Sequence, residues 1–183
     1  MIKLAEKPRI NNVVCTADLR QFVDITKISE LSCGIYDEAI YGGICGYIKI
    51  PQMKGKVAIF STGKMISTGG KSSTKAIEQL AHAKFLLLQE NIISDVKLQP
   101  QIRNIVATLS TSQKLPLKSL SSKIPGSKYD PDVFPAMILK REKGCTFSIF
   151  ASGKIVITGA KSESEINNST VKLIQKLNKL MKE

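Results

Sequence analysis

One thirteen-residue stretch occurs twice in this chain, and its repetition constrains the fold more than any other feature. Residues 60–72 read FSTGKMISTGGKS and residues 150–162 read FASGKIVITGAKS, so seven of the thirteen positions are identical. Each copy has an apolar run ending in Phe, a Gly-Lys turn, an alternating run ending in Thr-Gly, and Lys-Ser before a helical pattern. A β-hairpin that leads into a helix is therefore predicted twice, which is typical of internal duplication.

The segments that precede the two copies also match. INNVVCT at residues 10–16 corresponds to IRNIVAT at residues 102–108, which pairs Asn12 with Asn104. Each half reads as strand, short helix, several antiparallel strands and long helix. Strands are expected at residues 9–17, 41–50, 57–60, 65–68 and 102–108, and long helices at 72–90 and 162–181. We predict an α+β fold in which two pseudo-symmetric repeats, residues 1–91 and 92–183, share one sheet with helices over one face.

The other face of that sheet has nothing in the sequence to cover it. The period of two in a strand places Asn12, Val14 and Thr16 on one face and Val13 and Cys15 on the opposite one. The uncovered face is predicted to carry Val14, Ile66, Val106 and Val156. These side chains are too apolar for an ordinary solvated face, so they predict a ligand surface.

The long helices are predicted to be amphipathic and to face the core. The first predicted core stripe is Ile77, Leu80, Ala81, Phe85 and Leu88. The second is Ile166, Thr170, Leu173, Ile174, Leu177, Leu180 and Met181.

The net charge of +12 favours a polyanionic partner, although surface lysines can serve solubility alone. Residues 1–91 carry twelve Lys and Arg against eight Asp and Glu, and residues 92–183 carry fifteen against seven. The four cysteines show no CxxC spacing and His82 is the only histidine, so we expect no metal and no cofactor. Cys15 and Cys45 are expected to be reduced, buried thiols. No ordered carboxylate cluster, phosphate-binding loop or nucleophile with a base indicates an enzyme.

No signal peptide and no run of about 20 apolar residues is present, so we expect a soluble intracellular protein that does not enter a membrane. The paired motifs N-x-V-x-T and F-x-x-G-K-x-x-x-T-G-x-K-S, together with YDPDVFPA at residues 129–136, resemble the TATA-box-binding protein family. The match runs from about residue 9 to residue 180 and looks archaeal in style. The resemblance implies a saddle made of one curved ten-stranded antiparallel sheet. Its concave face would bind the DNA minor groove, and its helices would lie on the convex face.

In this family, residues at matching positions contact DNA. The resemblance implies that Asn12 and Asn104 donate to base acceptors and that Val and Ile press on the groove floor. It implies two aromatic pairs that wedge between bases, Tyr41 with Phe60 in the first half and Phe134 with Phe150 in the second. It also implies phosphate contacts by Lys64, Lys71, Lys140, Lys154 and Lys161. The family is itself the usual illustration of a kink of roughly 80°. The implied DNA-binding residues are Asn12, Val14, Thr16, Tyr41, Phe60, Lys64, Ile66, Thr68, Lys71, Asn104, Val106, Thr108, Phe134, Pro135, Lys140, Phe150, Lys154, Val156, Thr158 and Lys161.

Four positions depart from the family pattern. Tyr41 stands in place of a wedge Phe, and Tyr47 in place of a phosphate-binding Arg. Ala58 and Ser148 stand where the family usually has Leu near the wedges. Tyr41 makes the first-half kink the less secure one, because a hydroxyl pushed between stacked bases needs a hydrogen-bond partner. The other three departures reduce the contact area of the underside, so a weaker or shifted DNA preference is expected of a divergent paralogue that keeps the scaffold.

The resemblance also implies partners. Asp130, Asp132 and Val133 match the stirrup that transcription factor B grips, although a solvated turn is an equal reading. The implied function is a general transcription initiation factor that binds and bends A·T-rich promoter DNA and recruits factor B and RNA polymerase. The alternative is a paralogue that acts mainly as a protein-interaction or regulatory module. The expected state is a monomer on DNA, with a dimer as the alternative off DNA. The expected location is the archaeal cytoplasm or nucleoid, or the nucleus of a eukaryote.

Overall fold

The computed structural model describes residues 2–39, 41–140 and 144–181. Helices and strands follow the order expected from the duplication. They are β1 (Arg9–Asp18), η1 (Ile25–Glu30), β2 (Gly34–Ile35), η2 (Tyr41–Gly43), β3 (Cys45–Ile48), β4 (Lys56–Phe60), β5 (Lys64–Gly70), α1 (Ser73–Gln89), β6 (Gln101–Ser110), α2 (Leu117–Lys123), β7 (Ser127–Lys128), β8 (Ala136–Lys140), β9 (Thr146–Phe150), β10 (Lys154–Ala160) and α3 (Glu163–Leu180).

Hydrogen bonds join the strands of the described residues into one ten-stranded antiparallel sheet. Its order, β2-β3-β4-β5-β1-β6-β10-β9-β8-β7, is the same in each half when read from the edge to the centre. The chain divides into two compact units: unit 1 is Met1–Asn11 with Asn104–Glu183, and unit 2 is Asn12–Arg103. These limits are not those of the predicted repeats, because each unit includes the start of the other repeat's first strand. The repeat boundary at residues 91 and 92 remains a prediction.

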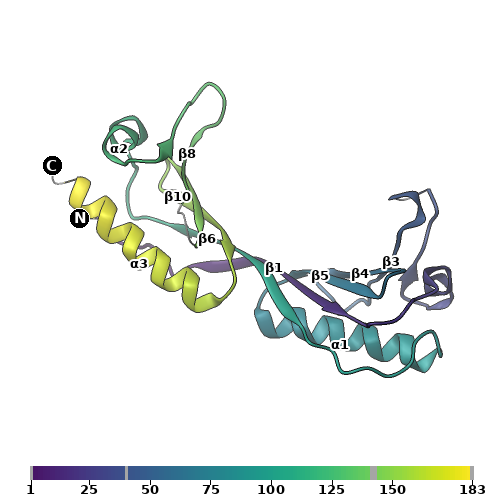
Figure 1. The fold of residues 1–183 in the computed structure, drawn as a ribbon. Coiled ribbons are helices and arrows are strands. Elements are labelled where there is room, and N and C mark those ends of the chain that lie inside the picture. The colour runs from purple at the N-terminus through teal and green to yellow at the C-terminus, as the bar shows by residue number, and fades with distance from the viewer. Residues whose placement is uncertain (1, 40, 141–143, 182–183) are drawn as a thin grey trace. The chain divides into compact units, whose positions relative to one another are not determined.

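In unit 2, α1 packs against β4 and β5 (Figure 1). Its buried residues are Ala76, Gln79, Leu80, Ala83 and Leu87. The predicted stripe is therefore wrong except at Leu80 and the half-buried Leu88, since Ile77 is 39% exposed and Phe85 is 51% exposed. The helix is rotated by about one residue because it approaches the sheet closely: a Cβ added to Gly70 would lie 3.2 Å from the Cβ of Ala76. Only a small side chain fits there.

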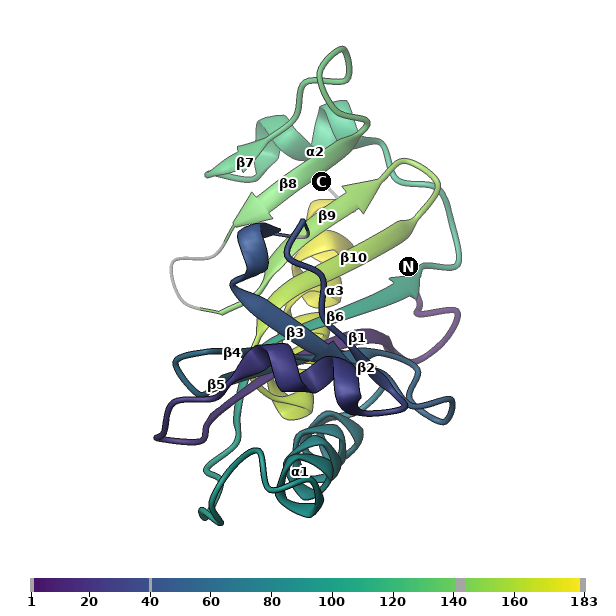
Figure 2. The same cartoon turned by 90° about the vertical axis from the view of Figure 1, so that its right-hand side faces the viewer.

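In unit 1, α3 packs against β10 and α2, and Figure 2 shows it behind β9 and β10. Its buried residues are Ile166, Ser169, Thr170, Leu173 and Leu177. The predicted stripe is confirmed for this helix except at its end, where Met181 is 38% exposed.

The Lys-Ser pair that ends each copy of the repeated stretch begins a helix, as predicted. Ser72 is the N-cap of α1, and its hydroxyl accepts a hydrogen bond from the backbone N–H of Lys75 at 3.2 Å. Ser162 does the same for the N–H of Glu165 at 3.1 Å. Each bond satisfies one of the N–H groups that a helix leaves unpaired at its start.

The two cores differ at one matched pair of positions. In unit 2 the buried Ser67 hydroxyl donates to the side-chain oxygen of Gln79 at 2.6 Å, so β5 and α1 share a buried polar bond. The residues ninety positions later in unit 1 are Ile157 and Ser169, both buried. The duplicated scaffold therefore holds its helix with different chemistry in each half.

The strand predicted at residues 41–50 is shorter than expected. Residues Tyr41–Gly43 form a 3-10 turn, and β3 begins at Cys45. Gly42 and Gly43 have φ values of 61° and 67°, which belong to the left-handed region and end an extended strand. This part of the prediction is wrong because the two glycines were read as loosening a strand rather than as making a turn.

The Thr-Gly step of each repeated stretch is a β-bulge. Between β1 and β5 the register shifts after Val13, so that Thr68 and Gly69 lie opposite the single residue Val14. Between β6 and β10 the register shifts in the same way, and two residues lie opposite Val106. Gly69 and Gly159 have φ values of 86° and 90°, which explains why glycine follows threonine in both copies.

None of the four cysteines forms a disulfide: Cys15, Cys45 and Cys145 are buried, and Cys33 is half-buried. Burial raises the pKa of the Cys15 thiol, which opposes formation of the reactive thiolate. In the described residues there is no group of three or more His, Cys, Asp or Glu side chains placed to hold a metal. Among the described helices, none combines the length and apolar character needed to cross a membrane.

We expect Gly69→Ala to destabilise the protein more than Gly159→Ala. Both substitutions put a side chain at positive φ, which costs about 1–3 kcal/mol. At Gly69 the new Cβ would also lie 2.5 Å from the backbone Cα of Gly55, whereas at Gly159 the nearest atom would be 3.6 Å away. Urea unfolding of the full chain measures both losses in the free energy of unfolding. Equal losses would contradict the tighter packing of the unit 2 bulge.

Candidate nucleic-acid interface

The strands of each unit have one face that its long helix does not contact. In unit 2 a row of paired residues crosses this open face from Thr16 to Ile66, Ala58 and Tyr47. All four are half-buried, whereas the residues that alternate with them, such as Val57, Ile59 and Met65, are fully buried against the helix side. The predicted outward residue Ile66 therefore lies on the face away from α1.

Unit 1 has the equivalent row. It runs from Thr108 to Val156, Ser148 and Ile138, and all four residues are again half-buried. Val14 and Val106, which lie opposite the bulges, are half-buried too. The structure thus places the predicted groove-floor residues on the open face of their own unit. Ala58 and Ser148, the two small departures, are central in these rows and reduce their apolar area.

The two central asparagines are held by the bulge glycines. The backbone N–H of Gly69 donates to Asn12 Oδ1 at 2.6 Å in unit 2. The N–H of Gly159 donates to Asn104 Oδ1 at 2.8 Å in unit 1. The hydrogen-bond pattern assigns the oxygen of each amide to the glycine. Each amide therefore directs its NH₂ group, a donor of two hydrogen bonds, away from the glycine.

The second-half aromatic residues are brought together. The ring centroids of Phe134 and Phe150 lie 6.2 Å apart, with an interplanar angle of 62°. Phe134 is 46% exposed and its neighbour Pro135 is exposed. The pair leaves much of the Phe134 ring exposed, and the wedge role of both rings remains a prediction.

Of the first-half pair, the structure describes the side chain of Phe60. Phe60 lies at the end of β4, pairs with Cys45 and is half-buried. The side chain of Tyr41 lies outside the described residues, so its proposed wedge role remains a prediction.

The predicted phosphate-contacting lysines are all exposed. Lys64 and Lys154 begin β5 and β10, at the matched turns of the two repeats. Lys71 and Lys161 precede the helix caps, and Lys140 ends β8. Thr68 and Thr158 belong to the bulges and are half-buried.

One cation on the open face was missed by the sequence analysis. The ammonium group of Lys56 lies 3.7 Å from the ring centroid of Tyr47, a cation–π contact. Tyr47 therefore does not leave this part of unit 2 uncharged, because its ring positions a lysine from the neighbouring strand. The contact could have been predicted from the pairing of β3 with β4, because that pairing places residues 47 and 56 on the same face of the sheet.

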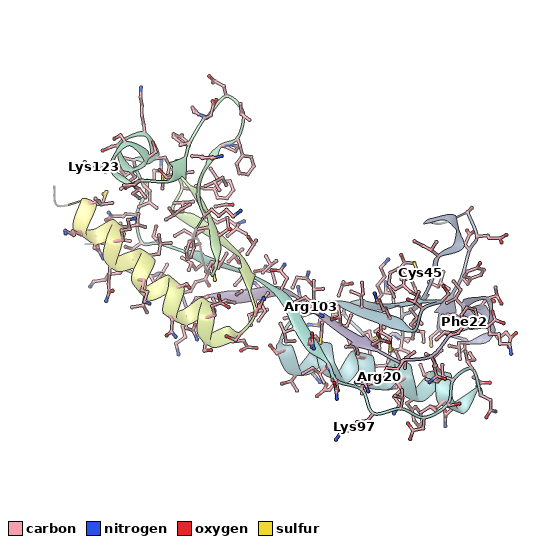
Figure 3. The ribbon with its side chains drawn as sticks, viewed as in Figure 1. Arg20, Phe22, Cys45, Lys97, Arg103 and Lys123 are labelled. Carbon is pink, nitrogen blue, oxygen red and sulfur yellow. The ribbon has the colours of Figure 1, made fainter. Side chains whose placement is uncertain are left out.

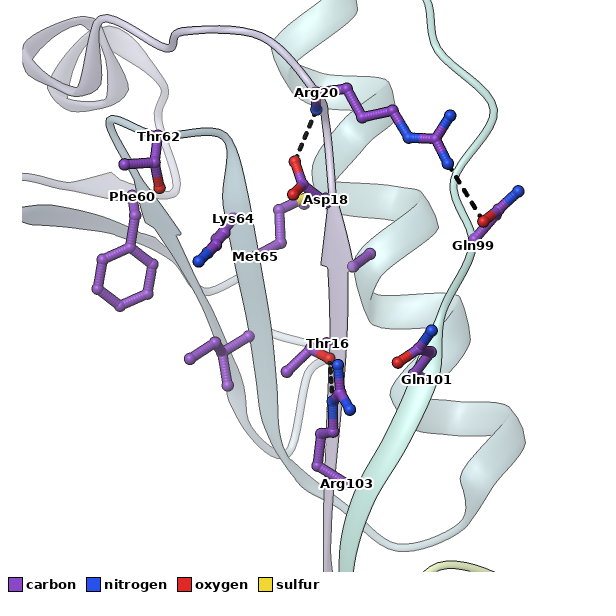
Figure 4. Close-up of a pocket in the computed structure, with 12 residues that line it drawn as sticks. Thr16, Asp18, Arg20, Phe60, Thr62, Lys64, Met65, Gln99, Gln101 and Arg103 are labelled. Carbon is purple, nitrogen blue, oxygen red and sulfur yellow. Dashed lines mark hydrogen bonds between the residues drawn. The ribbon is translucent and has the colours of Figure 1, made fainter.

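A hollow of about 540 Å³ lies on the open side of unit 2. Figure 4 shows the side chain of Arg103 bonded to Thr16, with Arg20, Lys64 and Phe60 also lining the hollow. The Nε–H of Arg103 donates to the Thr16 hydroxyl at 2.9 Å. Arg103 was also missed. The alignment of the two repeats could have indicated it, because it pairs the charged Arg103 with the neutral Asn11.

The predicted partner-binding residues lie in a tight turn. Asp130 holds this turn: its carboxylate accepts the N–H of Asp132 at 3.1 Å and its carbonyl accepts the N–H of Phe134 at 2.9 Å. Asp132 is exposed and Val133 is 81% exposed. Asp130 is exposed as well, so all three residues are presented to solvent, and Asp130 in addition holds the turn.

Comparison with known proteins agrees with this geometry. The profile of the family described as "Transcription factor TFIID (or TATA-binding protein, TBP)" matches residues 7–89 and 99–180, one segment for each repeat. The TATA-box-binding protein of Cenarchaeum symbiosum is 46% identical over 178 residues, covering 97% of this chain and 98% of the relative. That of Aeropyrum pernix is 34% identical, covering 92% of this chain and 83% of the relative.

The fold is shared with a solved structure. Methanococcus jannaschii TBP superposes with a TM-score of 0.83 at 24% sequence identity, covering 95% of this chain and 99% of that one. The predicted fold class, two repeats in one ten-stranded antiparallel sheet with helices, is confirmed. The matched family consists of transcription factors, which confirms the prediction that the protein is not an enzyme. The chain belongs to the TATA-binding protein family of transcription factors.

Proposed function

We propose that the protein is a general transcription initiation factor that binds A·T-rich promoter DNA in the minor groove and bends it. The observation that carries the proposal is the pair of asparagine amides held at the bulges. In each, Oδ1 is occupied by a glycine N–H, so the amide offers donors beside an apolar face. The minor groove of A·T pairs presents only acceptors and an additional donor appears at G·C, so fixed donors favour A·T.

The rest of the open face supports the same partner. Half-buried Val14, Ile66, Val106 and Val156 match an apolar groove floor, and the exposed lysines supply positive charge for phosphates. The names of the archaeal relatives, TATA-box-binding proteins, agree with this proposal. We further propose that the exposed Asp132 and Val133 contact transcription factor B, which recruits RNA polymerase, and that the protein works in the nucleoid of an archaeal cell.

We expect tighter binding to a TATA-like duplex than to a G·C-rich duplex of equal length. Binding should weaken steeply with salt, by a slope of about 0.9 in log K against log salt for each phosphate that is neutralised. Gel-shift titrations of both duplexes at several salt concentrations measure this. Equal affinity for the two duplexes would leave the alternative of a protein-interaction module with altered DNA binding.

The same titration tests whether the amide of Asn104 contributes to DNA binding. Asn104→Asp keeps an oxygen for the Gly159 N–H but removes the amide donor, so affinity for the TATA-like duplex should fall roughly 10- to 100-fold. Asn167→Asp makes the same chemical change at an exposed position of α3 and serves as the matched control. Similar losses for both variants would mean that charge alone, and not the donor at residue 104, is responsible.

We expect Phe134→Ala and Phe150→Ala each to reduce the bend in bound DNA by about 20° or more, because each removes a wedge. Energy transfer between dyes at the two duplex ends measures the bend. Phe85→Ala removes an exposed Phe from α1 and should leave the bend unchanged. A normal bend in both wedge variants would show that these rings do not insert.

Asp132→Lys should weaken assembly with factor B about tenfold or more while preserving binary DNA binding, because buried interfacial charge pairs are costly to break. Asp130 is unsuitable for this test, since its replacement would disrupt the turn that positions Phe134. Glu38→Lys, an equal change of charge at an exposed site in unit 2, is the control. Gel shifts with and without factor B report both steps, and unchanged assembly for Asp132→Lys would refute the contact.

A further inference from the structure

The residue before the second central asparagine breaks the symmetry of the two repeats. Arg103 in unit 2 donates its Nε–H to the hydroxyl of Thr16 at 2.9 Å. Asn11, its counterpart ninety-two positions earlier, instead accepts a hydrogen bond from the hydroxyl of Thr108 at 2.9 Å in unit 1. The same cross-strand link is thus made twice, once with a cationic donor and once with a neutral amide.

The guanidinium of Arg103 reaches the open face at Thr16. Its partner Thr16 pairs with Ile66 in the row that crosses the face, and both line the hollow shown in Figure 4. Figure 3 also shows Arg103 near the start of β6. The side chain is exposed, and it hydrogen-bonds to an uncharged hydroxyl. That bond orients the guanidinium without neutralising its charge.

The other charges of the hollow are arranged differently. The guanidinium of Arg20 donates to the side-chain oxygen of Gln99 at 3.2 Å, while its backbone N–H donates to the carboxylate of Asp18 at 2.7 Å. Asp18 is also opposite Lys64 in the strand ladder. The acidic residue that lines the hollow, Asp18, therefore lies beside Arg20 and Lys64. It is two positions further along β1 than Thr16, to which Arg103 is bonded.

We propose that Arg103 is a further minor-groove contact that makes the half-site bound by unit 2 less tolerant of G·C pairs than the half-site bound by unit 1. This inference rests on the proposed function. A guanidinium has five N–H donors and no acceptor, and only one donor is used by Thr16. A·T pairs offer acceptors in the minor groove, whereas the guanine amino group is a second donor that a guanidinium cannot pair with. Asn11 carries no such charge at the matched position.

An asymmetric contact sets the orientation of a pseudo-symmetric protein. On a duplex with one half made only of A·T pairs and a single G·C pair in the other half, unit 2 takes the A·T half. The preference is about tenfold, within the usual range for discrimination of one base pair.

The test reads this orientation directly. An iron chelate is attached to Ala39→Cys, an exposed site in unit 2, in a background in which the half-buried Cys33 is replaced by Ser. Cleavage of the asymmetric duplex should occur mainly beside the A·T half. Arg103→Asn should make cleavage equal at both ends, and the exchange Asn11→Arg with Arg103→Asn should reverse the preference.

Controls separate the inference from its alternatives. Arg103→Lys keeps the charge but loses the Nε–H link to Thr16, and we expect it to retain only part of the preference. Lys176→Asn removes one positive charge from an exposed position of α3 and should leave orientation unchanged. Thermal melts confirm that each variant is folded, and Arg103→Asn alone decides the matter if the exchange variant does not fold.

Two failures are distinguishable. A labelled parent protein that prefers A·T-rich to G·C-rich duplex, but keeps its orientation after Arg103→Asn, would overturn the role of Arg103 and leave the proposed function intact. A parent protein with no preference between those duplexes would overturn the proposed function itself.

Discussion

The hydrogen bond from a bulge glycine to a central asparagine links the fold of this protein to its binding face. The bulge needs a glycine at positive φ, and its N–H would lack a ladder partner without the amide oxygen of Asn12 or Asn104. Satisfying that N–H fixes the amide, and the fixed amide presents its donors on the open face. One bond therefore serves backbone stability and ligand recognition together, and it occurs in both units.

Much of the fold could be predicted from the sequence because the same pattern of residues occurs in both repeats. The repeated stretch predicted both hairpins and both helix starts, and the open face followed from the alternation of residues in β1 and β6. The rotation of helix α1 about its own axis was not predictable in this way. Leu, Ile and Phe dominate its apolar pattern, yet the small Ala76 and Ala83 face the sheet because the backbones approach closely near Gly70. Periodicity counts apolar residues and does not measure the distance between helix and sheet.

The site was predictable to a different degree. The resemblance to the family predicted site residues only at positions that match the family's motifs. It predicted no role for residues at which this chain differs from those motifs. Lys56 and Arg103 are such positions: both are oriented by a neighbouring strand, through the ring of Tyr47 and the hydroxyl of Thr16. Pairings of this kind depend on strand register, which a single sequence reveals only after the strands are aligned. Unit 2 thus gains two cations on its open face that unit 1 lacks at the matched positions.

The buried Ser67–Gln79 bond has a consequence for how a duplicated chain assembles. Two similar helices and two similar half-sheets can in principle be exchanged during folding. If α1 packed on the strands of unit 1, the amide of Gln79 would face Ile157, and a buried polar group without a partner costs about 1–3 kcal/mol. In the correct packing the same amide is satisfied. A single polar pair in one core therefore disfavours mispairing between the repeats, and it favours the packing of each helix on the strands of its own unit.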